Sequence, residues 1–200
     1  MNRKLWLTPI GIAFVLVLAA GFSAWAQDAE TETLDDLRQA QEEQQDTDQF
    51  EFDLPLADET GRVTFSDLAD SEKPFILFWW LTDCPLCHLQ LPYIQQLQDQ
   101  IDEGELDLLV VTLCIDFETQ ECLEYLRKNE LSLAVLHDPR ARSTDSAYQI
   151  KELGCPLTYV FDEGGVLVDY IKGFRSNIGK SVIELLDLEQ VDQRETRRPE

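Results

Sequence analysis

Two cysteines separated by two residues, Cys84-Pro85-Leu86-Cys87, stand where an apolar run ends and a helical pattern begins. A thiolate at the N-terminus of a helix lies near unpaired backbone N–H groups and the positive end of the helix dipole, which lowers its pKa and makes it nucleophilic. The short spacing lets Cys87 reach a mixed disulfide on Cys84 and resolve it. The pattern therefore predicts a dithiol that exchanges disulfides.

A Cys-x-x-Cys sequence can also form half of a zinc site. Such a site requires a second Cys or His pair at compatible spacing, and none is evident in this sequence. We therefore expect no metal and no bound cofactor, so that cysteines are the only redox groups.

The segments around these cysteines alternate between strand-like and helix-like patterns. Residues 75–81 form a continuous apolar run, as in a strand buried on both faces, and residues 84–102 carry apolar side chains at helical spacing. This alternation predicts an α/β fold of three layers, with a central mixed sheet flanked by helices and an added N-terminal hairpin at 52–64. The other expected strands are 106–115, 133–136, 157–161 and 166–171, and the other expected helices are 118–129, 144–153 and 177–188.

The first 26 residues have the features of an export signal. Arg3 and Lys4 precede an apolar run at 10–22, and Ala24-Trp25-Ala26 offers a small-x-small cleavage site. The segment is expected either to be cleaved or to remain as an N-terminal membrane anchor, since residues 5–26 are long enough to span a bilayer. In both cases the remainder is exported, and we expect it in a bacterial periplasm.

Acidic composition sets the expected domain limits and excludes one class of partner. Residues 27–49 carry nine acids and one base, which predicts a disordered linker, and residues 191–200 are expected to form a flexible tail. The folded domain is therefore expected at 50–190. The formal net charge of −23 repels phosphate backbones, so we expect no nucleic-acid partner.

Three further features accompany the cysteine pair. Trp80 stands four residues before Cys84, Pro92 stands five residues after Cys87, and the run 154–165 begins with Gly-Cys-Pro and ends with Asp-Glu-Gly-Gly. With these features, residues 50–190 resemble the thioredoxin-like fold, and within it the exported TlpA/ResA-type redoxins, which are related to the AhpC/TSA redoxins. The front of the domain is similar to the start of this exported subgroup.

The resemblance implies an exported thiol-disulfide oxidoreductase that acts on protein disulfides. It implies that Cys84 attacks, that Cys87 resolves, and that Pro156 is a cis residue lying against the disulfide and steering the substrate backbone. The implied partners are protein disulfide substrates and a thiol electron donor, which can itself be membrane-bound.

Two positions depart from the pattern of many thioredoxins. Many thioredoxins have Trp directly before the first cysteine and a buried acid six residues before it. This chain has Asp83 and Phe78 at these two positions. A negative Asp83 opposes thiolate formation, and Phe78 cannot transfer a proton. His88, one helical turn after Cys84, either stabilises the thiolate as imidazolium or is an exposed polar residue. Trp80, Asp83, His88 and Cys155 are therefore candidate modulators.

The remaining cysteines allow more than one interpretation, because five cysteines leave one unpaired. Cys114, near the end of a strand, and Cys122, early in the next helix, form either a structural disulfide or two buried thiols. Cys155 should face the Cys84–Cys87 pair if Pro156 is cis. There it either takes part in exchange or packs as a small apolar group.

Two other functions remain as alternatives. A peroxiredoxin-like peroxidase is disfavoured because Leu81 stands where a Thr is expected three residues before the attacking cysteine. A copper metallochaperone of the thioredoxin fold is also disfavoured. The two cysteines of such copper-delivering relatives are separated by three residues, whereas Cys84 and Cys87 are separated by two. His137 would be the distant third ligand of such a site, although its position before Asp138-Pro139 predicts a loop residue.

Overall fold

The computed structural model describes residues 49–188. The expected export segment (1–26), nearly all of the expected linker (27–49) and the expected tail (191–200) therefore lie outside the described residues. Within residues 49–188, no helix is both long enough and apolar enough to cross a membrane.

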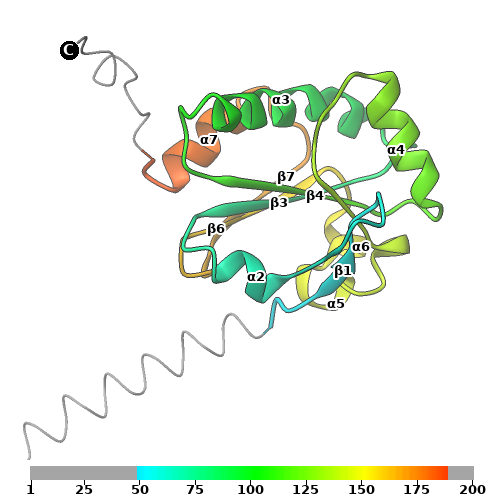
Figure 1. Cartoon of the computed structure of the whole chain (residues 1–200), viewed down its shortest axis with the longest axis horizontal. Helices are drawn as coiled ribbons and strands as arrows, with labels where there is room; N and C mark the ends of the chain where they lie inside the picture. Colours follow the sequence, from blue (N-terminus) through cyan, green and yellow to red (C-terminus); the bar gives the residue numbers. More distant parts are fainter. Residues whose placement is uncertain (1–48, 189–200) are drawn as a thin grey trace, which may run out of the picture. The chain divides into compact units, whose positions relative to one another are not determined.

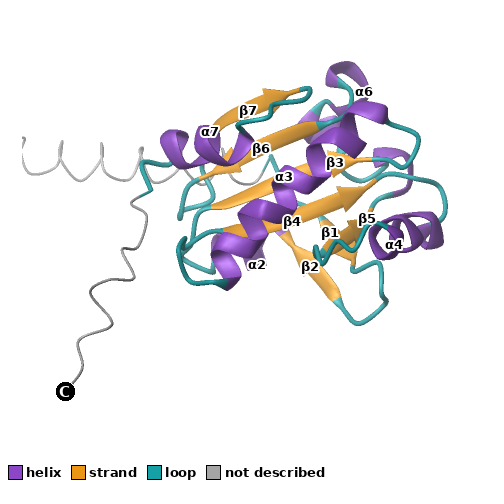
Figure 2. Ribbon diagram, turned by 90° about the horizontal axis from the view of Figure 1, so that it is seen from above, coloured by secondary structure: helices purple, strands orange, loops and turns teal. Residues whose placement is uncertain are grey.

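Five strands form a mixed sheet in the order β5-β4-β3-β6-β7 (Figure 2). The central β3 is parallel to β4, which is parallel to β5, whereas β6 is antiparallel to β3 and β7 is antiparallel to β6. The sheet is therefore mixed, as the sequence predicts. Its strands are β3 (Phe75–Trp80), β4 (Leu109–Cys114), β5 (Val135–His137), β6 (Leu157–Phe161) and β7 (Leu167–Lys172).

Helices cover both faces of this sheet (Figure 1). One face carries α3 (Pro85–Asp102), α4 (Thr119–Lys128) and α7 (Ile178–Leu185), and the other carries α2 (Phe65–Ala69), α5 (Asp145–Tyr148) and α6 (Ile150–Leu153). The strands β1 (Asp53–Pro55) and β2 (Arg62–Thr64) pair in a separate antiparallel hairpin. The three layers and the added hairpin confirm the predicted fold class.

The central strand β3 explains why its sequence is apolar throughout. All six of its side chains are fully buried. Its even-numbered residues pack with α3, α4 and α7, while its odd-numbered residues pack with α2, α5 and α6. Because successive side chains of a strand point to opposite faces, one strand supplies both cores. The chain that leads into Cys84 therefore starts from the most tightly enclosed element of the fold.

Two local features differ from the sequence-based expectation. The expected helix 144–153 is divided into α5 and α6, because Gln149 between them adopts a left-handed conformation with φ of 52°. The sequence pattern also did not predict α2, which begins at Thr64 with reciprocal hydrogen bonds between Thr64 and Asp67. His137 is the buried last residue of β5 and not a loop residue, so that prediction is wrong.

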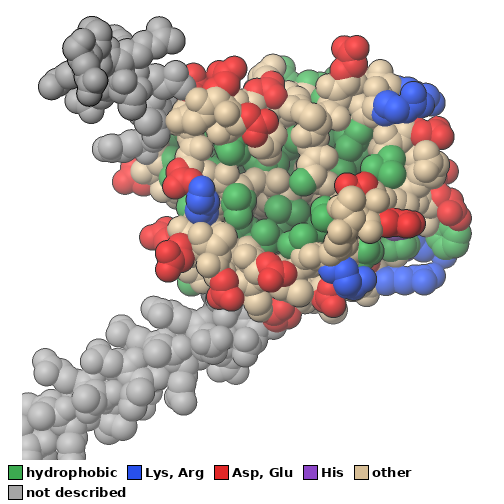
Figure 3. Space-filling model, in the orientation of Figure 1, with side chains coloured by type: hydrophobic (Ala, Val, Ile, Leu, Met, Phe, Trp, Pro, Cys, Tyr) green, Lys and Arg blue, Asp and Glu red, His purple; other side chains and the backbone are tan. Residues whose placement is uncertain are grey.

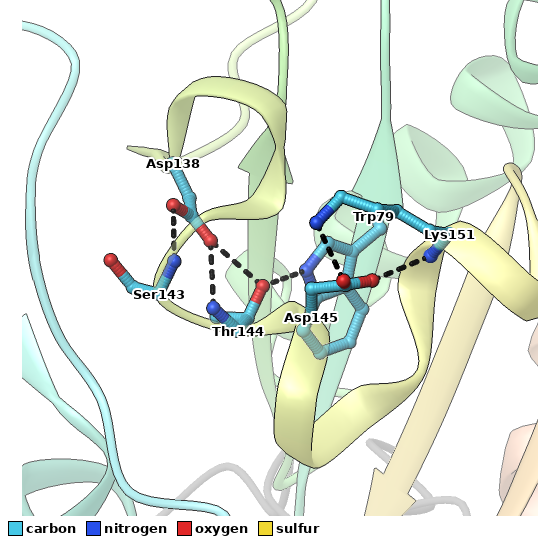
Figure 4. Close-up of polar contacts among 6 residues, drawn as sticks. All are labelled: Trp79, Asp138, Ser143, Thr144, Asp145 and Lys151. Carbon is cyan, nitrogen blue, oxygen red and sulfur yellow. Dashed lines mark hydrogen bonds and ion pairs between the residues drawn. The ribbon is translucent and has the colours of Figure 1, made fainter.

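A buried carboxylate holds the loop that follows β5 (Figure 4). Asp138 accepts hydrogen bonds from the backbone N–H groups of Ser143 and Thr144 and from the Thr144 hydroxyl. The Thr144 hydroxyl oxygen in turn accepts a 3.1 Å hydrogen bond from the Trp79 indole. These hydrogen bonds hold the start of α5 against the face of the sheet on which the odd-numbered side chains of β3 lie.

Candidate active site

The sheet topology brings four sequence-distant segments to one end of the molecule. In the parallel strands Trp80 is paired with Cys114, and Cys114 with His137. The antiparallel β6 begins at the same end, because Leu157 is paired with Trp79. The residues that follow β3, β4 and β5 and those that precede β6 therefore meet here, at the carboxyl edge where α/β sheets usually bind their ligands.

Cys84 and Cys87 occupy the first turn of α3 and are joined in a disulfide with Cα atoms 5.1 Å apart. Cys84 is the N-cap residue, and its Sγ accepts a 3.1 Å hydrogen bond from the Cys87 backbone N–H. Pro85 suits the first helical position, where no N–H donor is needed. Cys84 is half-buried whereas Cys87 has no exposed surface, so only Cys84 offers its sulfur to a partner.

The peptide bond between Cys155 and Pro156 is cis, and this segment lies beside Cys84. The Cys155 carbonyl oxygen is 3.6 Å from Cys84 Sγ. The Cys155 thiol is unpaired, and burial, with a smaller contribution from the negative charge of Asp116, raises its pKa to about 12. A thiol that stays protonated at neutral pH is a weak nucleophile. The geometry therefore favours the packing role for this side chain over a role in exchange.

Three other candidate modulators lie around the first turn of α3. Asp83 is exposed, and Trp80 is buried with its indole N–H donating to the Thr112 hydroxyl over 3.3 Å. His88 is half-buried, so its interpretation as an exposed residue is wrong. Its Nε2 lies 2.7 Å from the Thr82 carbonyl oxygen, and its ring stacks on that of Tyr125 with centroids 4.7 Å apart. His88 therefore supports the turn before Cys84.

Asp116 belongs to this site although the sequence analysis did not consider it. Its Oδ2 accepts a 2.8 Å hydrogen bond from the Thr82 backbone N–H, and its Oδ1 accepts a 3.1 Å bond from the Thr82 hydroxyl. A usable signal was present in the sequence, since an acid directly follows the expected buried strand 106–115.

Cys114 and Cys122 form a second disulfide, with Cα atoms 6.3 Å apart and no exposed surface on either residue. Their sulfurs and the Asp116 carboxylate lie within 4.8 Å of one another, and these residue types can hold a metal ion. In the structure, however, both sulfurs are bonded to each other and are not thiolate ligands. Both ring nitrogens of His137 have hydrogen-bond partners within the protein. Nδ1 lies 2.7 Å from the Thr119 hydroxyl, and Nε2 lies 3.0 Å from the Asp116 carbonyl oxygen.

Comparisons with known proteins agree with this geometry. The model of the AhpC/TSA family matches residues 46–170. The thiol:disulfide interchange protein DsbE of Escherichia coli K12 is 25% identical over 169 residues, which are 84% of each chain.

Solved structures share the fold. A thiol:disulfide interchange protein of the thioredoxin family from Chlorobium tepidum superposes with a TM-score of 0.55 at 18% identity, over 68% of this chain and 92% of the other. A secreted disulfide oxidoreductase of Mycobacterium tuberculosis, homologous to the E. coli DsbE, gives 0.56 at 14% identity, over 69% and 96%.

Proposed function

The chain belongs to the AhpC/TSA family and is a thiol-disulfide oxidoreductase, and we propose that it acts on protein disulfides through Cys84 and Cys87. The observation that carries this proposal is the unequal exposure of the two sulfurs at the start of α3. Cys84 is half-buried at the N-cap, where backbone N–H groups stabilise a thiolate, and Cys87 is enclosed directly behind it.

The reaction follows from this arrangement when the pair is in its dithiol form. The Cys84 thiolate attacks one sulfur of a substrate disulfide, and the other substrate sulfur leaves as a thiolate that takes up a proton. The Cys87 thiolate then attacks the Cys84 sulfur of the mixed disulfide and releases the second substrate thiol. The substrate gains two electrons and two protons, and a thiol donor must return the same to the Cys84–Cys87 disulfide.

The surface around Cys84 fits a polypeptide substrate. Leu86, which lies between the two cysteines, and Leu89, two residues after Cys87, are 47% and 55% exposed. Apolar side chains exposed beside a reactive sulfur favour partners that also present an apolar surface. Pro156 follows the Cys155 carbonyl group, whose oxygen is 3.6 Å from Cys84 Sγ, and we propose that it contacts the substrate backbone as the family resemblance implies.

The site of action proposed here is outside the cytoplasm, in the periplasm of a bacterium. The support is the export pattern of residues 1–26, together with a similar protein from M. tuberculosis that is described as secreted. We further propose a thiol electron donor held in or near the membrane. If the N-terminal segment is retained as an anchor, the acidic segment 27–49 would tether the domain close to that donor.

Serine variants of the two cysteines test the proposed roles. In assays with a disulfide-bonded protein and a thiol reductant, Cys84→Ser should abolish turnover because the attacking sulfur is lost. Cys87→Ser should accumulate a mixed disulfide between Cys84 and the substrate, which mass spectrometry detects as a covalent complex. The control Val168→Ser changes an exposed residue of β7 and should turn over normally. Wild-type turnover by both cysteine variants would contradict the proposal.

A further inference from the structure

Thr82 is held at every polar atom it possesses. Its N–H and hydroxyl donate to the two carboxylate oxygens of Asp116, and its carbonyl oxygen lies 2.7 Å from His88 Nε2. Thr82 sits inside the turn that delivers Cys84 to α3, because the Cys84 N–H donates to the Leu81 carbonyl over 3.3 Å. The placement of Cys84 against a substrate therefore depends on how firmly Thr82 is held.

The Asp116 carboxylate also touches the second disulfide. Its Oδ2, the oxygen that binds the Thr82 N–H, lies 3.1 Å from Cys114 Sγ and 3.7 Å from Cys122 Sγ. In the disulfide neither sulfur carries a proton, so neither can donate to Oδ2. If a dithiol reductant delivers two electrons and two protons, both sulfurs become thiols, and each S–H can then donate to the oxygen that Thr82 uses.

We propose that Asp116 is a positioning residue for disulfide exchange at Cys84, and that the Cys114–Cys122 disulfide keeps Asp116 Oδ2 available to Thr82. The inference rests on the proposed function, because it assigns Asp116 to the turn that carries the attacking cysteine. A carboxylate that follows β4 thus holds the turn before α3, in a chain whose β3 has Phe78 where many thioredoxins have a buried acid.

The charge of Asp116 is felt within the same site. It contributes, after burial, to the raised pKa of Cys155, whose carbonyl oxygen is 3.6 Å from Cys84 Sγ. Asp116 thus combines two effects, a geometric one through Thr82 and an electrostatic one through its charge. Variants that keep the shape but remove the charge can separate them.

The first experiment compares Asp116→Ala with Asp116→Asn in the full chain. The measured quantity is the rate constant of the reduced Cys84–Cys87 pair with oxidised glutathione, from pH 5 to 9. Asp116→Ala leaves Thr82 unanchored, and the rate should fall by about tenfold or more, since small misplacements of reacting groups are costly. In Asp116→Asn the amide oxygen accepts from the Thr82 N–H and the NH₂ group donates to its hydroxyl, so most of the rate should return. The pH profile of Asp116→Asn should move to lower pH, because a negative charge that opposes thiolate formation is gone.

Asp67→Ala is the matched control for lost stability. Asp67 is also an acid that binds a threonine backbone N–H, but its partner is Thr64, the N-cap residue of α2, on the opposite face of the sheet. This variant should melt at a lower temperature with an unchanged rate and pH profile. A wild-type rate and profile in folded Asp116→Ala would overturn the assignment of Asp116.

The second experiment tests the contribution of the second disulfide with two double variants. Cys114→Ala with Cys122→Ala, and Cys114→Ser with Cys122→Ser, both remove the disulfide, but only serine hydroxyls can donate to Asp116 Oδ2. The serine pair should react more slowly than the alanine pair in the same glutathione assay. Equal rates in the two double variants would overturn the role of the disulfide. If neither folds, the wild type decides it: the rate with both disulfides reduced should be lower than the rate with only Cys84–Cys87 reduced, and equal rates would overturn the role.

The wild type and Cys84→Ser, run beside these variants, separate the two levels of inference. Retained turnover in Cys84→Ser would contradict the proposed function itself. Loss of turnover in Cys84→Ser with no effect of Asp116→Ala would contradict only the positioning role.

Discussion

Three residues around Cys84 act through different atoms. Cys155 contacts the sulfur with its backbone carbonyl, His88 contacts the turn with its ring, and Asp116 holds the turn with both carboxylate oxygens. The Cys155 carbonyl oxygen is 3.6 Å from Cys84 Sγ, while the Cys155 thiol stays protonated because burial raises its pKa to about 12. A residue's type alone therefore does not tell which of its atoms serves the site.

The Cys155 thiol leads to a prediction about pH. Its folded-state pKa of about 12 lies above the ordinary value of 9.0, so the folded protein binds this proton more tightly than the unfolded chain. The resulting stabilisation is fully present below pH 9 and is lost as the pH rises toward 12. The free energy of unfolding of the wild type should therefore fall more steeply over this range than that of Cys155→Ala. Urea unfolding at several pH values measures the difference, and parallel pH profiles would argue against it.

Among the helices, α2 and α3 each begin at a residue whose side chain accepts a hydrogen bond from a free backbone N–H group of the first turn. Cys84 caps α3 with its sulfur, and Thr64 caps α2 with its hydroxyl. The helix α2 has only five residues, so it has few internal hydrogen bonds to sustain it. Its cap and the burial of Phe65 and Leu68 therefore carry most of its stability.

Thr64→Ala should reveal the contribution of this cap. The Thr64 hydroxyl accepts a 3.0 Å hydrogen bond from the Asp67 N–H, and the Asp67 carboxylate accepts a 2.8 Å bond from the Thr64 N–H. Loss of an N-cap hydroxyl typically costs about 1 kcal/mol, which should appear as a lower free energy of unfolding in urea. Thr64→Ser keeps the hydroxyl and should stay close to the wild type. An equal loss in both variants would show that packing of the threonine methyl group, and not capping, is responsible.

In the whole molecule, acidic side chains outnumber basic ones. The full chain has 39 acids and 16 bases, and the face in Figure 3 shows acidic groups around its rim with apolar groups between them. The ion pair of Lys73 with Asp107 joins two exposed side chains and contributes little to stability. Repulsion among the excess acids therefore opposes the compact state.

Raising the salt concentration should consequently stabilise the protein at neutral pH. Salt shortens the Debye length from about 30 Å at 0.01 M to about 8 Å at 0.15 M, so it screens the long-range repulsion between acids. The melting temperature should rise between these two NaCl concentrations. Above about 0.15 M NaCl, screening of the repulsion should raise it only slightly further. A melting temperature that falls with NaCl would mean that attractive ion pairs outweigh the repulsion.

Most of the strands and helices, and the chemistry of the cysteine pair, could be predicted from the sequence. The apolar run of β3, the helical spacing after Cys84 and the hairpin near the C-terminus led to the three-layer mixed sheet, which is confirmed. The resemblance to the thioredoxin-like redoxins, carried by the cysteine pair, Trp80, Pro92 and the run 154–165, is confirmed by the family match. These signals are local, because periodicity and turn residues act over a few positions. The two-residue spacing of the cysteines is local in the same way.

Which distant residues share the site could not be predicted from the sequence and is visible only in the folded protein. Asp116 and Thr82 are 34 positions apart, and they meet because β3 and β4 pair in parallel register and end at the same edge. The pairing of Cys114 with Cys122, the stacking of His88 on Tyr125 and the division of the expected helix at Gln149 likewise depend on packing. Contacts of this kind depend on strand order, register and side-chain direction, which no short stretch of sequence specifies.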